Sequence, residues 1–215
     1  MPGSLVAVLG VVAAFLSGLS IAMVVRHRRR RHARSELADA LDDRLAEALG
    51  PGTGSHLERS PAVRRIAVVD ADAESRSGPA GEGDGSAGEG GGSTDEDDRA
   101  MLVPIVRVDL ETTDAPGMKI ILEYVADVLE AIHPELEARD ERVHRYDVEF
   151  TFGPGGLIVA GECRRVSVAP ELAARLLEDE RYGAFELRRD VERADRDDDS
   201  PTALWDDCRS SADRH

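Results

Sequence analysis

The apolar and polar residues of this chain form one long apolar run and, further on, one region of regular alternation. The apolar run covers residues 5–25 without a charged side chain, and as a helix it would span roughly 30 Å of hydrocarbon. A secretory signal peptide would carry basic residues ahead of the run, but residues 1–4 carry none. The pattern predicts a single transmembrane helix at residues 5–25, preceded by a short external N-terminus.

Arginines follow the apolar run directly and predict which side of the membrane the rest of the chain occupies. The basic positions are Arg26, Arg28, Arg29, Arg30, Arg31 and Arg34. Because basic residues beside a membrane span resist translocation, they favour a cytoplasmic location for everything that follows. The predicted localisation is the cell membrane, single-pass, with the lipid bilayer as a partner. Binding of anionic lipid head groups is an alternative role for these arginines.

Small residues recur at four-residue spacing inside the apolar run, at Gly10, Ala14, Gly18 and Ala22. On a helix this spacing aligns them along one face, where small side chains permit the close approach of a second helix. One interpretation is a transmembrane pairing surface and a homo-oligomer. The other is chance, because alanine and glycine are common throughout the chain.

Two further segments precede the region of regular alternation. Leucines at every fourth position predict an amphipathic helix from Ser35 to Gly50, which completes a basic stop and juxtamembrane segment of residues 26–50. Those leucines are Leu37, Leu41, Leu45 and Leu49. Residues 51–100 are rich in glycine, serine and acidic residues and predict a disordered linker. Within this linker, residues 65–69 are either a strand or a docking peptide.

The alternation of residues 101–192 predicts a small folded α/β domain. Strands are expected at residues 103–110, 146–152 and 157–168, helices at residues 116–134 and 170–182, and a short last strand at residues 185–187. The order βαββα with a final β is that of a ferredoxin-like two-layer sandwich, an α+β fold. Residues 193–215 predict a disordered acidic tail, in which Trp205 docks on the domain, anchors to a partner or is exposed by chance.

Three details of the expected sheet bear on function. Its face away from the helices should present charged and polar side chains to water, namely Arg107, Asp109, Asp147, Glu149 and Thr151. The third strand changes apolar phase between Cys163 and Val166, which predicts a β-bulge near residues 164–165 where a ligand site would fit. Residues 153–156 lack the spacing of a phosphate loop and predict a hairpin turn.

The charge composition disfavours one class of function and suggests an environment. The net charge is −16, which disfavours binding to the phosphate backbone of nucleic acid. RNA binding on the open sheet face is also disfavoured, because the aromatic residues are expected to point to the core. Lys119 is the sole lysine among many arginines, and this acidic, arginine-rich composition resembles that of proteins from salt-accumulating halophilic archaea. A GC-rich genome would give the same bias.

Candidate chemical sites are few, and each has a structural explanation. Glu130 and His133 have the Glu-x-x-His spacing of carboxylate-bridged metal sites, but without a second copy they indicate a solvated helix face. Cys163 and Cys208 fit neither a disulfide framework nor a zinc pattern. A contact between Cys163 and His144 is interpreted as that of a structural thiol. No catalytic residue, metal site or cofactor is therefore predicted.

These patterns together predict a membrane-anchored, non-enzymatic interaction or scaffold protein. Its small domain would bind an unknown protein partner or a second copy of itself. Two alternatives stay open, a regulatory domain that senses a small molecule and an enzyme without a recognisable motif. No particular family is recognised, since the expected order of elements occurs with many functions.

Overall fold

The computed structural model describes residues 28–51, 57, 59–70, 100–110, 112, 114–153, 161–197 and 200–208. The chain divides into two compact units, Met1–Asp39 and Ala40–His215. In the first unit residues 28–39 are helical, so that Ser35 lies inside a helix and does not begin one. The second unit contains a five-stranded sheet with its helices.

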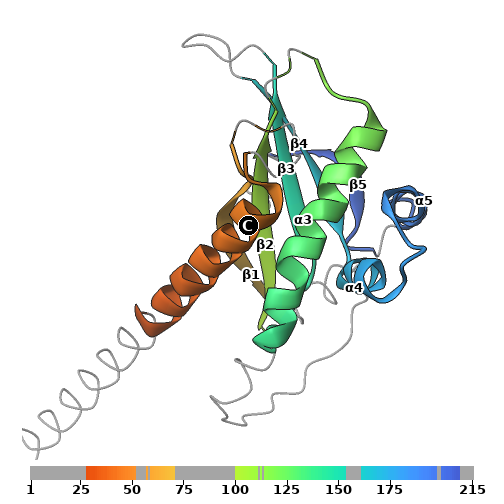
Figure 1. The fold of residues 1–215 in the computed structure, drawn as a ribbon. Coiled ribbons are helices and arrows are strands. Elements are labelled where there is room, and N and C mark those ends of the chain that lie inside the picture. The colour runs from red at the N-terminus through yellow and green to blue at the C-terminus, as the bar shows by residue number, and fades with distance from the viewer. Residues whose placement is uncertain are drawn as a thin grey trace, which may run out of the picture. The chain divides into compact units, whose positions relative to one another are not determined.

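The second unit is an α+β domain in which the strands follow one another across the sheet in chain order (Figure 1). The strands are β1 (Ala62–Asp70), β2 (Ala100–Asp109), β3 (Tyr146–Phe152), β4 (Glu162–Val168) and β5 (Ala203–Asp207). The helices are the segment at residues 40–49, α3 (Met118–Ala138), α4 (Pro170–Glu178) and α5 (Ala184–Ala194). β2 and β3 are parallel, and every other neighbouring pair is antiparallel.

The core lies between the helices and the sheet face to which the alternating apolar residues of β3 point, since Tyr146 of β3 contacts His133 of α3 there. Val108 of β2 is opposite Phe150 of β3, and both are fully buried. α3 lies against this face with a stripe of buried residues at helical spacing, among them Val125 and Leu129 (Figure 1). The strand at residues 146–152, the clearest alternation in the sequence, is confirmed.

The prediction of a ferredoxin-like sandwich is wrong. That fold has a split βαβ unit, with a further strand between the two parallel strands, whereas β2 and β3 are direct neighbours. The sheet also contains β1 and β5, one at each edge, which lie within the stretches that composition assigns to a linker and a tail. Residues 65–69, for which a strand was one of two interpretations, lie inside β1.

The strand predicted at residues 185–187 is instead the beginning of α5. Phe185 and Leu187 alternate with polar residues as a strand would, but Leu187 and Val191 are four residues apart and both are fully buried. The Glu186 carboxylate accepts a hydrogen bond from the backbone N–H of Gly183 at 3.1 Å, which caps the helix N-terminus. Helical burial therefore outweighs the short alternation.

Two residues, Pro134 and Gly153, mark a predicted helix end and the start of a predicted turn. Pro134 does not end α3, which continues to Ala138 because Leu136, in the turn after the proline, is buried in the core. At the predicted hairpin turn of residues 153–156, only Gly153 belongs to the described residues. Its φ of 101° is a conformation that suits glycine and strains other residues.

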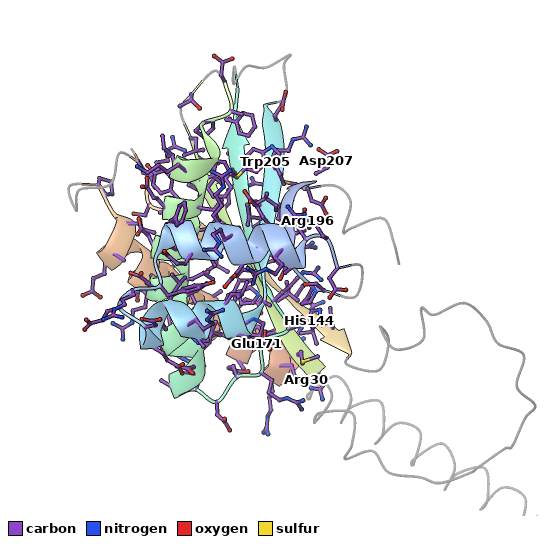
Figure 2. The ribbon with its side chains drawn as sticks, turned by 90° about the vertical axis from the view of Figure 1, so that its right-hand side faces the viewer. Arg30, His144, Glu171, Arg196, Trp205 and Asp207 are labelled. Atoms are coloured by element: carbon purple, nitrogen blue, oxygen red, sulfur yellow. A yellow bond between two sulfur atoms is a disulfide. The ribbon has the colours of Figure 1, made fainter. Side chains whose placement is uncertain are left out.

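A disulfide holds β5 at the edge of the sheet, contrary to the expectation for the two cysteines. Cys163 of β4 and Cys208, which directly follows β5, are bonded with their Cα atoms 5.6 Å apart. The Trp205 indole, which Figure 2 labels, stacks on Phe152 with ring centroids 6.1 Å apart. The irregularity predicted near residues 164–165 is present on the side of β4 that pairs with β5, where the register shifts between Arg165 and Ser167, while the β3–β4 pairing is continuous.

The structure does not support the prediction of a single-pass membrane protein. Residues 5–25, with the proposed pairing positions, lie outside the described residues, as does Arg26. Among the residues that the structure describes, no helix is both long enough and apolar enough to cross a bilayer. Stable disulfides are typical of oxidising compartments, so the bond between Cys163 and Cys208 is also at odds with the predicted cytoplasmic location. The described architecture is instead an α+β domain with a mixed sheet.

Candidate functional site

The sheet face away from the helices carries buried ion pairs in place of the exposed acidic surface expected from the sequence. Glu149 is 1% exposed. Its Oε2 atom lies 2.7 Å from Nη1 of Arg64 and 3.5 Å from Nη2 of Arg107. These contacts connect β1, β2 and β3 across the sheet. Because a buried carboxylate is tolerated when it is paired and hydrogen-bonded, Glu149 has a structural role.

Asp147 forms the second buried pair on the same face and is also 1% exposed. Its Oδ1 atom accepts hydrogen bonds from Oγ of Ser167 at 2.7 Å and from Nε of Arg145 at 3.0 Å. Nη1 of Arg165 lies 3.7 Å from Oδ2. Asp147 and Glu149 are therefore already occupied by arginines and a serine of the same domain, while Asp109 of this face is exposed, as expected, and accepts a hydrogen bond from Thr151.

The candidate chemical residues of the sequence do not come together in a reactive site. His133 is 6% exposed, so the expected solvated histidine is a core residue, whose Nδ1 shares a hydrogen bond of 2.5 Å with the Tyr146 hydroxyl. Burial lowers the pKa of His133. In the described part of the chain, the group spaced for a metal ion is Glu149 with Cys163 and Cys208, and the disulfide occupies both sulfurs.

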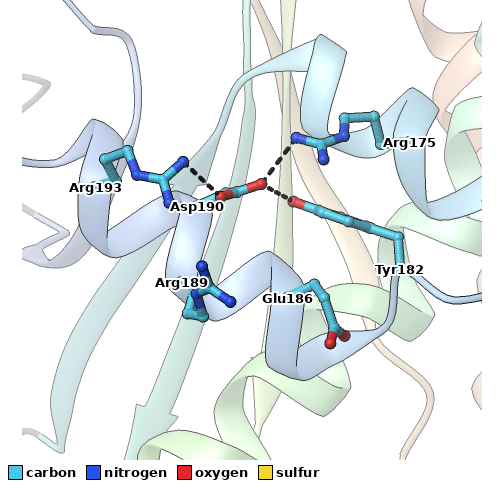
Figure 3. A pocket seen from close by; sticks show the side chains of 6 residues that line it. All are labelled: Arg175, Tyr182, Glu186, Arg189, Asp190 and Arg193. Atoms are coloured by element: carbon cyan, nitrogen blue, oxygen red, sulfur yellow. Dashed lines mark hydrogen bonds and ion pairs between the residues drawn. The ribbon is translucent and has the colours of Figure 1, made fainter.

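A cavity of about 260 Å³ lies between α4 and α5 and is rich in arginine (Figure 3). It is lined by Arg175, Tyr182, Glu186, Arg189, Asp190 and Arg193. We call it the arginine cavity. Arg175 comes from α4, Tyr182 precedes α5, and the other four residues lie on one side of α5 at helical spacing.

Asp190 is the centre of the arginine cavity. Its Oδ2 atom accepts hydrogen bonds from Nη1 of Arg175 at 2.8 Å and from the Tyr182 hydroxyl at 3.1 Å (Figure 3). Its Oδ1 atom accepts a hydrogen bond of 3.1 Å from Nη1 of Arg193. The Arg175 guanidinium also lies 4.4 Å from the centroid of the Tyr182 ring, within cation–π distance. Burial, and then the nearby Asp190 carboxylate, raise the pKa of Tyr182.

A second hollow, of about 410 Å³, lies between the helix at residues 40–49 and α3. It is lined by Arg44, Glu47, Ala48, Glu130, Ala131, Pro134, Glu135 and Ala138. We call it the helical groove. Its apolar lining consists of three alanines and one proline, and small side chains of this kind allow another backbone to come close. Its polar lining is mainly acidic.

The acidic residues along the helical groove differ in how they are neutralised. Glu135 accepts hydrogen bonds from Nε of Arg139 at 2.8 Å and from Nε of Arg44 at 3.3 Å, and these bonds lower its pKa. Glu130 has no arginine or lysine partner among the described residues. Partial burial, and then the carboxylate of Asp127 one turn away, raise the pKa of Glu130. Glu130 thus contributes uncompensated negative charge to the groove.

Asp127 extends this negative charge along α3. Partial burial, and then the neighbouring Glu123 carboxylate, raise the pKa of Asp127. Glu123 itself is paired with Lys119, with Nζ and Oε1 3.6 Å apart. Burial and a neighbouring carboxylate therefore both disfavour the ionised forms of Asp127 and Glu130. Among the described residues, no arginine or lysine is paired with either of them.

No protein-family model, no curated protein and no solved structure gives a significant match to this chain. The geometry of the arginine cavity and the helical groove therefore carries the functional argument. Sequence patterns single out Glu130 of the groove, although as part of a Glu-x-x-His pair, and they single out no residue of the arginine cavity. The signal for the cavity is the spacing of Glu186, Arg189, Asp190 and Arg193, which becomes visible once residues 184–194 are treated as a helix. The signal for the groove is the alanine spacing on α3, which depends on a second helix beside it.

Proposed function

We propose that the second unit is a protein-interaction module whose helical groove receives a basic amphipathic helix of a partner protein. The support is the shape of the groove, which lies between two helices and has small residues in its lining. An amphipathic helix that lies in such a groove is a recurring mode of recognition, in which anchors one turn apart carry the contact. Ala131, Pro134 and Ala138 lie about one turn apart along α3, so the groove offers small residues at the interval at which the anchors of a bound helix repeat.

The observation that carries the proposal is the uncompensated charge of Asp127 and Glu130 at a groove whose lining combines acidic residues with small apolar ones. A lysine or arginine of the partner would lie next to these carboxylates and favour their ionised forms, which desolvation and mutual repulsion disfavour in the free domain. Glu135 is less available, because Arg44 and Arg139 already bind it. The partner helix is therefore expected to place its basic residues toward Asp127 and Glu130.

The proposal is tested with a synthetic helical peptide that carries lysines along one face and alanines along the other. Its dissociation constant for the full chain is measured by fluorescence anisotropy at low salt. Glu130→Lys should weaken binding by about fivefold, the effect of about 1 kcal/mol for an exposed ion pair. Glu171→Lys is the matched control, because Glu171 is an exposed residue of α4 that does not line the groove and changes the net charge equally.

Two results would count against the interaction module. Equal weakening by Glu130→Lys and Glu171→Lys would show that the peptide responds only to the net charge of the chain. Backbone amide shifts on titration of ¹⁵N-labelled protein should cluster at the residues that line the groove. Shifts spread over all faces of the domain would place the peptide elsewhere.

A further inference from the structure

We propose that the arginine cavity binds a small oxyanion, the carboxylate or phosphate group of an organic molecule. The proposal is independent of the helical groove, which involves other helices. It starts from composition, since the chain has 43 acidic and 27 basic residues and its arginines have an excess of acidic partners. The cavity departs from that balance, because three arginines and two carboxylates line it. One formal positive charge is left for a ligand.

The three guanidinium groups have hydrogen-bond donors in excess of their partners. Each offers five N–H donors in a fixed planar arrangement. Arg175 and Arg193 each donate one hydrogen bond to Asp190. Arg189 makes no ion pair with any other described residue. Unused donors from three side chains therefore line one cavity, and a planar fork of N–H groups is the geometry that carboxylate and phosphate oxygens accept best.

The arginines are also positioned before a ligand arrives. Asp190 holds Arg175 and Arg193 on opposite sides, as Figure 3 shows, and its side chain is 16% exposed. The ring of Tyr182, which is 5% exposed, lies against the Arg175 guanidinium and limits its movement. Long side chains that are already ordered lose less conformational entropy when they bind. Asp190 and Tyr182 are therefore positioning residues, and the arginines are the groups that contact the oxyanion.

A cation is a poorer fit to the same cavity. Asp190 is the central carboxylate, and both of its oxygens already accept hydrogen bonds from Arg175, Tyr182 and Arg193. The Glu186 carboxylate caps α5 through the backbone N–H of Gly183. A metal ion or an amine would have to displace these donors and would lie among three guanidinium groups. The charge and the donor pattern both select an anion.

The experiment follows the arginine Nε–Hε signals of the ¹⁵N-labelled full chain by NMR during titration with inorganic phosphate, acetate or chloride at constant ionic strength. We expect saturable shifts of the Arg175, Arg189 and Arg193 signals with phosphate or acetate and not with chloride. A stronger response to phosphate assigns a phosphate ligand, and a stronger response to acetate assigns a carboxylate ligand. Equal responses to all three salts would mean ionic screening only and would overturn the proposal.

A matched pair of variants separates the cavity from the general charge of α5. Arg189→Gln removes an exposed guanidinium that lines the cavity and should weaken the oxyanion affinity by about tenfold. Arg188→Gln is its control, because Arg188 is bound to Glu192 with Nε and Oε1 2.6 Å apart and does not line the cavity. Both positions are exposed, so both variants are expected to fold. Equal loss of affinity in the two variants would refute a site in this cavity.

Discussion

Removal of the disulfide is the perturbation whose effect the structure defines most fully. Cys163 and Cys208 connect β4 to the end of β5, and their sequence separation is 45 residues. The cross-link restricts the unfolded chain, which loses the conformations in which these residues are far apart. With the chain-entropy relation for a loop of that size, the expected loss of unfolding free energy is about 4 kcal/mol at 25 °C. That is a large part of the stability of a domain of this size.

The assay is urea unfolding of the oxidised protein and of the double variant Cys163→Ser/Cys208→Ser. Trp205 is the single tryptophan of the chain and belongs to β5, so its fluorescence reports directly on that strand. Circular dichroism reports on the helices in the same samples. The expected result is a lower urea midpoint in the double variant, with Trp205 released from Phe150 and Phe152 at or before the loss of helix.

Two observations would refute the reasoning about the disulfide. The first is an oxidised protein that takes up two thiol-specific labels without reduction, because then the bond does not form. The second is a double variant whose unfolding free energy lies within about 1 kcal/mol of the wild-type value, well below the expected entropic effect. Addition of a reductant to the double variant is the control, since it should change nothing.

Three further predictions concern the helices and the buried histidine. Leu187→Ala should lower the free energy of unfolding by about 2–5 kcal/mol, because Leu187 is fully buried. Phe185→Ala is the control and should change the urea midpoint little, because Phe185 is 68% exposed. Gly50→Ala should lower the melting temperature, because the added Cβ would lie 2.2 Å from the carbonyl oxygen of Ala46. Since burial lowers the pKa of His133 in the folded state, the unfolded state binds a proton first, and the free energy of unfolding should fall as the pH decreases through the ordinary histidine pKa of about 6.5. His133→Gln should remove that slope, and an unchanged slope in urea titrations from pH 7.5 to 5.5 would contradict it.

Sequence patterns correctly predict those helices and strands whose buried residues repeat regularly, every second residue in a strand or every three to four residues in a helix. The strand at residues 146–152 is predicted at its true bounds because four large apolar residues alternate with polar ones. α3 is predicted from its apolar stripe, with its end misplaced at Pro134. In these cases the residues that decide the structure are neighbours in sequence, so propensity and periodicity contain the information.

The elements that sequence reasoning misses depend on contacts with distant residues. β1 and β5 are edge strands in acidic or glycine-rich surroundings, and only pairing with β2 and β4, together with the disulfide, reveals them. The buried state of Glu149 depends on Arg64, which is 85 residues away in the chain. Alternation alone places such a carboxylate on the solvent side of the sheet. Tertiary pairing decides its environment, and no local pattern contains that pairing.

The same limit explains why neither candidate site is visible in the sequence. The helical groove needs two helices that are separated by more than 60 residues to lie side by side. The arginine cavity needs Arg175 of α4 beside Asp190 of α5, a contact that exists because residues 184–194 are a helix. If residues 185–187 are taken as a strand, the four lining residues of α5 no longer share one side of a helix, and the cavity cannot be predicted.

The measurement that tests the interaction module most directly is the affinity of the lysine-alanine helical peptide for a chain whose groove is filled. Ala131 lines the helical groove and is half-buried, so Ala131→Leu should occupy the space that the peptide needs while leaving the core unchanged. Ala174→Leu on α4, at a half-buried position outside the groove, is the control. The proposal predicts at least about a tenfold loss of affinity, or about 1.4 kcal/mol, for Ala131→Leu alone. Equal affinity of the two variants for the peptide would contradict it.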